Sequence, residues 1–370
     1  MPISLLSVQG YRSIRTVWTR LGRVNVILGP NGSGKTNLYR SLALLVEAAQ
    51  GRLAWSVARE GGMPSLMWAG GHRKHERHGV IVEARFDAFV YRLEIGLVTA
   101  IQTIFKLDPE VKKESVTFAE GRRKPVTLME RAGPTAWMRD DDGKRVTYPL
   151  ELSSSESVLS QLRDRHRYPE IASIAERIQG WRFYHHFRTD SDASLRQPQV
   201  GVRTHVLASS GDDLAAAIQT IREVGDERAL DETVADAFPG GRVLVHADEM
   251  LRVGVRMQMP GIQRPLEASE LSDGTLRYLC LVAALLTPRP PELLALNEPE
   301  TSLHPQLLAP LGRLIARASR ASQLFITTHS QELADHIAKS GEAQTIELAL
   351  VEGETRIAGQ KVDDDEDAEE

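Results

Sequence analysis

The sequence predicts an α/β fold, in which a mixed sheet flanked by helices is interrupted by an inserted segment of mainly antiparallel strands and helix. Three observations predict it. Short apolar runs alternate with segments of helical apolar spacing towards both ends of the chain, as strands and helices do in α/β proteins. At about residues 80–150, β-rich runs are separated by Gly, Asp and Pro, the pattern of hairpins. A glycine-rich turn joins an early strand to a helix.

The N-terminal elements surround that turn. Residues 5–11 and 24–28 are predicted as strands because both are short β-rich runs. Residues 35–49 are predicted as a helix, since Leu38, Leu42 and Leu45 recur at helical spacing. Strand, glycine turn and helix together form the opening of an α/β unit.

Helices and strands are also predicted along the rest of the chain. Residues 156–180 have a helical pattern, and residues 181–188 (WRFYHHFR) have that of a strand. No heptad run is present, so we expect no long coiled-coil arm. From about residue 206 we expect helices at 212–224, 226–237, 272–286, 304–318 and from 331, strands at 293–296 and 324–327, and hairpins at 242–258 and 344–359.

These patterns predict three parts. Residues 1–50 and 206–360 form one discontinuous head domain, residues 51–205 an inserted lid or arm, and residues 361–370 an acidic disordered tail. Seven of the last eight residues are acidic, and like charges without apolar partners oppose ordering. Residues 51–205 hold 25 Lys and Arg against 20 Asp and Glu, a net charge of +5. That excess is compatible with nucleic acid and equally with an ordinary solvated surface.

Composition indicates a soluble, cytoplasmic protein without a membrane partner. Apolar residues make up 42% of the chain and charged residues 26%, a globular balance. The longest apolar run, at about 279–286, is far shorter than the roughly 20 residues of a membrane helix. The N-terminus shows no basic leader followed by an apolar core. Cys280 is the single cysteine, so no internal disulfide is expected.

The glycine-rich turn matches the pattern GxxxxGK[ST] between a predicted strand and a predicted helix, the context in which such a loop binds nucleotide phosphates. Glycines let backbone N–H groups point at the phosphates, beside the positive end of the helix. Lys35 is expected to reach the β- and γ-phosphates, and Thr36 to ligate Mg²⁺. The predicted ATP-binding residues are Gly29, Pro30, Asn31, Gly32, Ser33, Gly34, Lys35, Thr36 and Asn37.

A second candidate segment follows the predicted strand 293–296. Four apolar residues lead directly to Asn297 and Glu298, so a buried parallel strand would deliver polar groups at its carboxyl end, where α/β sheets bind ligands. A carboxylate there can orient the water that attacks a γ-phosphate. The sequence therefore places a hydrolytic group beside the phosphate-binding loop.

Four segments together resemble a known family. GPNGSGKTN (29–37), LSDGT (271–275), LLALNEPETSLHP (293–305) and TTHS (327–330) occur in the order of the Walker A, signature, Walker B with D-loop, and H-loop segments of ABC ATPases. VQGYRS near the start, LSDGTLRYL and EPE followed by LHP are similar to the heads of SMC, RecF and OLD proteins and to small RecF-related ATPases. The resemblance covers about 1–50 and 206–350.

The resemblance implies a P-loop ATPase in which two heads sandwich two ATP molecules with Mg²⁺. It implies that Ser272, Asp273 and Gly274 face the nucleotide of the other subunit. It further implies that Glu298 is the catalytic base and that His329 contacts the γ-phosphate. With Lys35, these two residues form the predicted catalytic set, and Thr36 and Asn297 form the predicted Mg²⁺ site.

The chain departs from the family pattern at three places. Asn297 stands where an aspartate usually holds Mg²⁺ through water, so we expect weaker Mg²⁺ dependence or slow turnover. Asp273 replaces the second glycine of the signature. SLHP stands where transporters have SALD, which argues against a transporter subunit.

Two other clusters have alternative interpretations. His72, His75 and His78 are spaced three apart and could bind a metal on a helix, or belong to a polar loop between glycines. The bases at 163–167 (RDRHR) and in 181–188 could neutralise and stack on nucleic acid. Otherwise the aromatic residues of 181–188 lie in the core and its bases outside.

Three functions therefore compete. The first is an ATPase that acts on DNA in repair or genome defence, and the second a regulatory ATPase that controls a separate effector protein such as a nuclease. The third, a transporter nucleotide-binding subunit, is disfavoured by SLHP and by the distance between the glycine-rich loop and the signature.

Overall fold

The computed structural model describes residues 3–71, 78–99, 102–121, 124–140 and 142–360. His72, His75 and the acidic tail at 361–370 lie outside these residues, whereas His78 is described and exposed. Within the described residues, no helix has the length and apolar character that crossing a membrane requires.

A six-stranded sheet forms the centre of the molecule, in the order β10-β15-β16-β3-β17-β18. Its strands are β3 (Val24–Leu28), β10 (Arg182–Tyr184), β15 (Leu293–Asn297), β16 (Gln323–Thr328), β17 (Gln344–Val351) and β18 (Glu354–Ile357). The first five in this order are parallel, and β18 pairs with β17 in an antiparallel hairpin. Every residue of β3, β15 and β16 is buried, as expected for parallel strands covered on both faces.

A second sheet of eight antiparallel strands has the order β2-β1-β4-β5-β6-β7-β8-β9. Its strands are β1 (Ile3–Tyr11), β2 (Ile14–Arg20), β4 (Val80–Phe86), β5 (Phe89–Leu97), β6 (Pro109–Phe118), β7 (Val126–Ala132), β8 (Thr135–Arg139) and β9 (Arg145–Thr147). The predicted hairpins of residues 80–150 are therefore present, and they extend a sheet that begins with the N-terminal strands.

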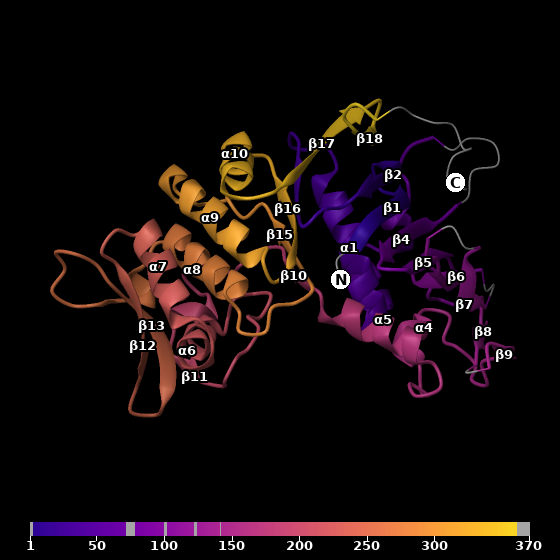
Figure 1. Ribbon diagram of the computed structural model, residues 1–370, viewed down its shortest axis with the longest axis horizontal. Coiled ribbons are helices and arrows are strands. Elements are labelled where there is room, and N and C mark those ends of the chain that lie inside the picture. Colours follow the sequence, from indigo (N-terminus) through magenta and orange to yellow (C-terminus); the bar gives the residue numbers. More distant parts are fainter. Residues whose placement is uncertain (1–2, 72–77, 100–101, 122–123, 141, 361–370) are drawn as a thin grey trace.

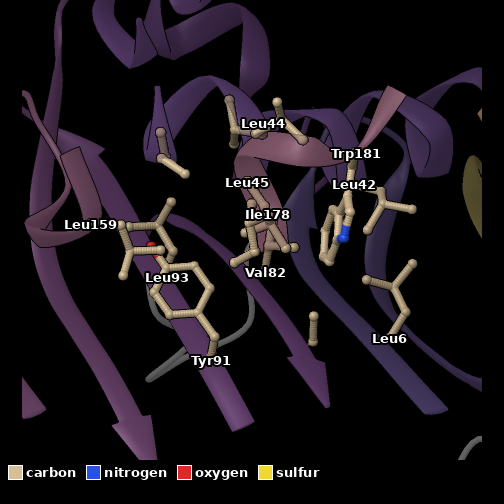
Figure 2. Close-up of a cluster of buried hydrophobic side chains, with 14 of the residues drawn as sticks. Leu6, Leu42, Leu44, Leu45, Val82, Tyr91, Leu93, Leu159, Ile178 and Trp181 are labelled. Atoms are coloured by element: carbon tan, nitrogen blue, oxygen red, sulfur yellow. The ribbon is translucent and has the colours of Figure 1, made fainter. Parts of the chain in front are cut away.

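The helix α1 (Lys35–Ala49) lies between the two sheets, and its apolar side chains form the centre of the first hydrophobic core. Leu42 and Leu45 of α1 pack with Leu6, Val82 and other residues of the antiparallel sheet (Figure 2). The helices α2 (Leu53–Arg59), α3 (Met63–Leu66), α4 (Val158–Gln161) and α5 (Pro169–Gly180) extend this core, into which α5 sends Ile178. One face of the parallel sheet, including Ala295 of β15, belongs to the same cluster.

The second core covers the opposite face of the parallel sheet, through neighbouring positions such as Leu294 and Leu296. Side chains alternate between faces along a strand, so each strand contributes to both cores. The covering elements, seen on the left of Figure 1, are α6 (Leu214–Val224), α7 (Glu227–Ala237), α8 (Asp273–Leu285), α9 (Leu308–Ala318) and α10 (Gln331–Ser340), with a small sheet of β11 (Gln199–Val200), β12 (Arg242–Ala247), β13 (Arg252–Gln258) and β14 (Leu266–Glu267). Single 3₁₀ turns occur at Ser194–Arg196, Ala268–Glu270 and Pro305–Leu307.

Three element predictions need correction. The predicted helix 156–180 is two helices, because Pro169 opens α5 and the preceding Tyr168 (φ −128°, ψ 62°) is not helical, as expected before proline. The predicted strand 181–188 pairs only over Arg182–Tyr184. The strand β2 was not predicted. The domain boundaries remain a prediction, yet strand pairing crosses both of them: β1 pairs with β4, and β10 pairs with β15.

Candidate nucleotide site

The glycine-rich loop lies between β3 and α1, as predicted, and the hairpin β17–β18 packs against it. Gly34 has φ +98°, and a Cβ there would lie 2.0 Å from Thr355 Oγ1. A Cβ on Gly29 would lie 2.5 Å from the carbonyl oxygen of Leu348. Glycine is therefore required at both positions by close approach of the hairpin, in addition to any contact with phosphate.

Lys35 is 3% exposed and carries its ammonium back over the loop. Nζ donates hydrogen bonds to the carbonyl oxygens of Gly29 at 2.7 Å and Pro30 at 2.9 Å, and lies 3.9 Å from Glu298 Oε1. Burial lowers the pKa of this ammonium, and the carboxylates of Glu298 and Glu300 oppose that shift. The ammonium is thus held between the loop and the end of β15, where an anionic ligand could replace its neutral partners.

Asn37, predicted to bind ATP, takes part in a hydrogen-bond network beside the glycine-rich loop. Its Nδ2 donates to Ser13 Oγ at 2.8 Å, and Ser13 Oγ lies 2.7 Å from Thr355 Oγ1. The backbone N–H of Thr355 donates to the carbonyl of Ser13 at 2.7 Å. These bonds tie α1, the turn between β1 and β2, and the C-terminal hairpin together beside the glycine-rich loop.

Polar groups gather at the carboxyl ends of β15 and β16, as predicted for Asn297 and Glu298. Asn297 Oδ1 accepts a hydrogen bond from Thr327 Oγ1 at 2.9 Å. The backbone N–H of Glu298 donates to the carbonyl of Thr327 at 2.9 Å. Glu298 itself has φ +46°, a left-handed conformation that is rare outside glycine and often occurs at functional sites.

His329 lies close to both acidic residues that follow β15, Glu298 and Glu300. Its Nδ1 lies 3.2 Å from Glu300 Oε1 and 3.8 Å from Glu298 Oε1. Glu300 is 7% exposed and accepts hydrogen bonds from Thr328 Oγ1 at 2.6 Å and from the backbone N–H of His329 at 3.1 Å. The structure therefore brings together Lys35, Glu298 and His329, and it adds Glu300 as the group that holds His329.

The end of β10 contributes two histidines that the sequence did not assign to this site. Tyr184 pairs with Leu296 in register, so the turn after β10 lies next to Asn297. His185 has its ring 5.8 Å from that of Tyr39 on α1. Although His185 is exposed as a whole, burial of part of its ring lowers its pKa, and Arg40 lowers it further. Polar residues directly after a short strand, part of the signal used for Asn297 and Glu298, could have identified this turn, although β10 itself contains Arg182.

The remainder of the segment 181–188 agrees with the second of its two interpretations. Trp181, Tyr184 and Phe187 are buried, whereas His185, His186 and Arg188 are exposed. Its aromatic residues therefore belong to the core rather than to a stacking platform.

The signature-like residues open α8. Ser272 is the N-cap, and its Oγ accepts from the backbone N–H of Thr275 at 3.2 Å. Asp273 forms an ion pair with Arg196. A Cβ on Gly274 would lie 2.6 Å from the carbonyl oxygen of Ser302. Among the described residues, no hydrogen bond or ion pair joins these three residues to the glycine-rich loop of the same chain.

Two orphaned polar atoms test whether these residues suit a bound nucleotide. Ser33 Oγ and Glu300 Oε2 are buried and lack a hydrogen-bond partner among the described residues. Buried polar groups are almost always paired, so these atoms have unused bonding capacity in the loop and in the facing acid cluster. No group of three or more His, Cys, Asp or Glu in the described residues could hold a metal alone.

A family model described as "AAA domain, putative AbiEii toxin, Type IV TA system" matches residues 102–335, more than half of the chain. This range holds the segments around Ser272, Asn297 and His329 and begins after the glycine-rich loop. The cytochrome c biogenesis ATP-binding export protein CcmA of Rhodospirillum rubrum is 52% identical over 54 residues, 14% of this chain and 23% of that protein. The chain thus matches about a quarter of the length of this curated relative.

Solved structures of SMC heads have the same fold. The SMC head bound to the C-winged helix domain of ScpA has a TM-score of 0.54 at 16% identity, covering 96% of this chain and 97% of that chain. The SMC head with an extended coiled coil bound to the C-terminal domain of ScpA, from Pyrococcus furiosus, has a TM-score of 0.52 at 14% identity, covering 96% and 95%. The predicted fold class is confirmed, with the helices and sheets of an SMC-like P-loop head.

Proposed function

The chain belongs to the family of AAA domains described as putative AbiEii toxin of type IV toxin–antitoxin systems, and on this premise we propose that it binds ATP with Mg²⁺ and hydrolyses the nucleotide. The observation that carries the proposal is the meeting of Lys35, Glu298 and His329 at one edge of the parallel sheet. A cation beside a carboxylate at the end of a buried strand is the arrangement that phosphoryl transfer needs.

In the proposed complex, different groups of the glycine-rich loop bind the phosphates and Mg²⁺. The backbone N–H groups of 29–36 and the N-terminus of α1 would receive the phosphates, and Lys35 would exchange its two carbonyl partners for phosphate oxygens. Thr36 and Asn297 would hold Mg²⁺, which neutralises phosphate charge when bound.

Glu298 is the group in this site that would take the proton of the attacking water. Its carboxylate is 28% exposed and lies within 4 Å of both Lys35 Nζ and His329 Nδ1. Glu300 holds the His329 ring from the protein side, so the other ring nitrogen is available for a phosphate oxygen. The left-handed backbone at Glu298 fixes the direction in which the carboxylate leaves the strand.

A second copy of the chain would complete the site. Ser272, Asp273 and Gly274 lie at the N-terminus of α8, which favours an anion, and they make no bond to the loop of their own chain among the described residues. We therefore propose that they contact ATP bound to the other copy, so that ATP closes two heads into a dimer.

Two variants test this function by sedimentation and phosphate release. Glu298→Gln should bind ATP, lower hydrolysis at least about 100-fold and accumulate an ATP-bound dimer. Ser272→Arg should bind ATP as a monomer and fail to dimerise. Wild-type hydrolysis by Glu298→Gln would disprove the base assignment, and an unchanged dimer in Ser272→Arg would disprove the contact across the interface.

DNA is the partner that we propose for this ATPase. The support is the net charge of +5 over residues 51–205 and the exposed loop between α4 and α5, which holds Arg163, Arg165 and Arg167. Arg165 is partly neutralised by Glu176 at 2.7 Å. Binding should be independent of sequence and weaken steeply with salt, because it depends on phosphate contacts.

Charge reversal separates DNA from an effector protein as the partner. Changing the three arginines of this loop to Glu should weaken binding of duplex DNA at low salt and leave ATP hydrolysis without DNA unchanged. A matched control reverses three exposed arginines of α7 and α9 and the turn after it, Arg228, Arg313 and Arg320. No DNA binding by the wild type at low salt, with or without ATP, would instead favour control of a separate effector.

A further inference from the structure

Arg277 is a buried cation on α8 whose hydrogen bonding is incomplete within the described residues. Its side chain is 3% exposed. Among the described residues no carboxylate oxygen forms an ion pair with it, and its Nε has no hydrogen-bond partner. Burial lowers the pKa of this guanidinium, and the carboxylates of Glu300 and Glu298, beyond ion-pairing distance, oppose that shift. Leaving a buried charge so incompletely paired costs folding free energy, so packing alone does not account for an arginine here.

The two terminal nitrogens of Arg277, Nη1 and Nη2, contact two other segments of the site. Nη1 lies 3.2 Å from His186 Nδ1, in the turn after β10. Nη2 donates to the carbonyl oxygen of Glu298 at 3.4 Å. A small cavity next to these atoms is lined by Asn297 and Pro299. One side chain thus joins the helix that Ser272 opens to the turn that carries the carboxylate.

Glu298 is the residue on which such a contact would act most strongly. Its φ of +46° is a strained conformation for a residue with a side chain. Its carbonyl also accepts the backbone N–H of Thr301 at 3.1 Å, so the turn is held from two sides. A small change in the position of Arg277 would alter the orientation of this peptide and of the carboxylate next to it.

We propose that Arg277 is a positioning residue that transmits movement of α8 to Glu298. Contact of Ser272 with the nucleotide of the second copy shifts α8, Arg277 moves with the helix, and the Glu298 carboxylate takes its orientation for attack of water. Hydrolysis in one chain therefore depends on engagement of its own signature residues with the other. The inference rests on the proposed function, because it requires two heads closed on ATP.

The main test compares Arg277→Met with the wild type. We expect turnover to fall about ten-fold or more, while ATP affinity and the ATP-dependent dimer remain. The midpoint of unfolding should stay the same or rise, because an incompletely paired buried charge is removed. Arg277→Lys should restore part of the turnover. Addition of ATP should alter amide hydrogen exchange at both the start of α8 and the turn 298–303 in the wild type, but only at α8 in Arg277→Met.

Arg222→Met is the matched control. Arg222 of α6 is well paired, with Nη2 donating to Asp231 at 2.7 Å and to the carbonyl of Val243 at 2.8 Å. Its loss should lower the midpoint of unfolding and leave the turnover of the folded protein unchanged. If Arg277→Met does not fold, His186→Leu takes its place, since it removes the partner of Nη1 in the turn after β10 and should lower turnover without loss of ATP binding.

Several results would overturn the inference. Turnover of Arg277→Met within two-fold of the wild type would do so, as would parallel loss of turnover, ATP binding and thermal stability, which indicates a structural role. Unchanged turnover in His186→Leu would do the same where that variant is used. A wild-type protein that neither hydrolyses ATP nor dimerises would instead disprove the proposed function, so the two failures are distinguishable.

Discussion

The antiparallel sheet and the edge of the parallel sheet bury charged side chains to the same degree but pair them differently. In the antiparallel sheet, Glu114 and Arg131 are 1% and 0% exposed. Glu114 accepts hydrogen bonds from Tyr91 Oη at 2.9 Å, Ser157 Oγ at 2.5 Å and the backbone N–H of Val158 at 2.9 Å. Arg131 donates to three backbone carbonyls, of residues 133, 153 and 156.

At the edge of the parallel sheet the pairing is incomplete. Lys35 has two neutral carbonyl partners and one carboxylate at 3.9 Å. Within the part of the chain that the structure describes, Arg277 Nε and Glu300 Oε2 have no hydrogen-bond partner. Because an unpaired buried polar group costs free energy, the first network stabilises the fold, while the second keeps bonding capacity for a ligand. Burial alone does not distinguish the two; the number of satisfied bonds does.

The largest effect is expected from breaking the satisfied network. Arg131→Met leaves Glu114 buried beside no cation and frees three carbonyls, so we expect a loss of about 3–5 kcal/mol in the free energy of unfolding. Urea unfolding measures it. Arg92→Met on strand β5 of the same sheet, where the side chain is partly exposed and pairs with Glu83, is the control and should cost under about 1 kcal/mol. Equal losses of stability in Arg131→Met and Arg92→Met would show that the buried network does not stabilise the fold more than an exposed ion pair.

Loss of Lys35 should weaken ATP binding and leave the free energy of unfolding largely intact, the reverse of what is expected for Arg131→Met. Lys35→Ala removes the ammonium expected to bind the terminal phosphates, so ATP affinity should fall by about 3 kcal/mol, or roughly 100-fold. Stability should not fall in parallel. The pKa of Lys35 is lowered by burial, so its proton is bound more tightly in the unfolded chain, and the charge destabilises the fold at neutral pH.

The pH dependence of Lys35→Ala sharpens that comparison. As pH rises through the lowered pKa of Lys35 towards its unfolded value, this destabilisation disappears in the wild type. Any advantage in stability of the variant over the wild type should therefore shrink at alkaline pH. Nucleotide titration and thermal unfolding measure the two effects. A variant that loses several kcal/mol of stability while keeping ATP affinity would place Lys35 with the structural charges.

The smallest effect is expected at Asn297. Its amide oxygen accepts from Thr327 Oγ1, a bond that an aspartate could also accept. Asn297→Asp adds a negative charge near the expected Mg²⁺, so we expect tighter Mg²⁺ dependence and turnover raised about five-fold, or ~1 kcal/mol. Slow hydrolysis could serve as a timer, in which case this faster variant performs worse in the cell. Coinciding Mg²⁺ titrations of the two proteins would show that Asn297 does not face the metal.

Local patterns predicted the nucleotide-binding elements well. β3 and α1 have the predicted bounds, because a continuous apolar run, a glycine turn and helical leucine spacing are properties of short stretches of chain. The acid at the end of β15 was predicted for the same reason. The family pattern implied a γ-phosphate site for both Glu298 and His329, and the structure shows that His329 Nδ1 lies 3.8 Å from Glu298 Oε1.

What the sequence determined by itself is the α/β class, the glycine-rich loop and the polar ends of the strands, since adjacent residues set each of them. Only the tertiary structure decided that β1 and β2 join the hairpins of 80–150, that β10 brings His185 and His186 to the site, and that Arg277 reaches Glu298. Such contacts join residues up to hundreds of positions apart, as with Ser13 and Thr355. They depend on how whole elements pack, and no local periodicity records that packing.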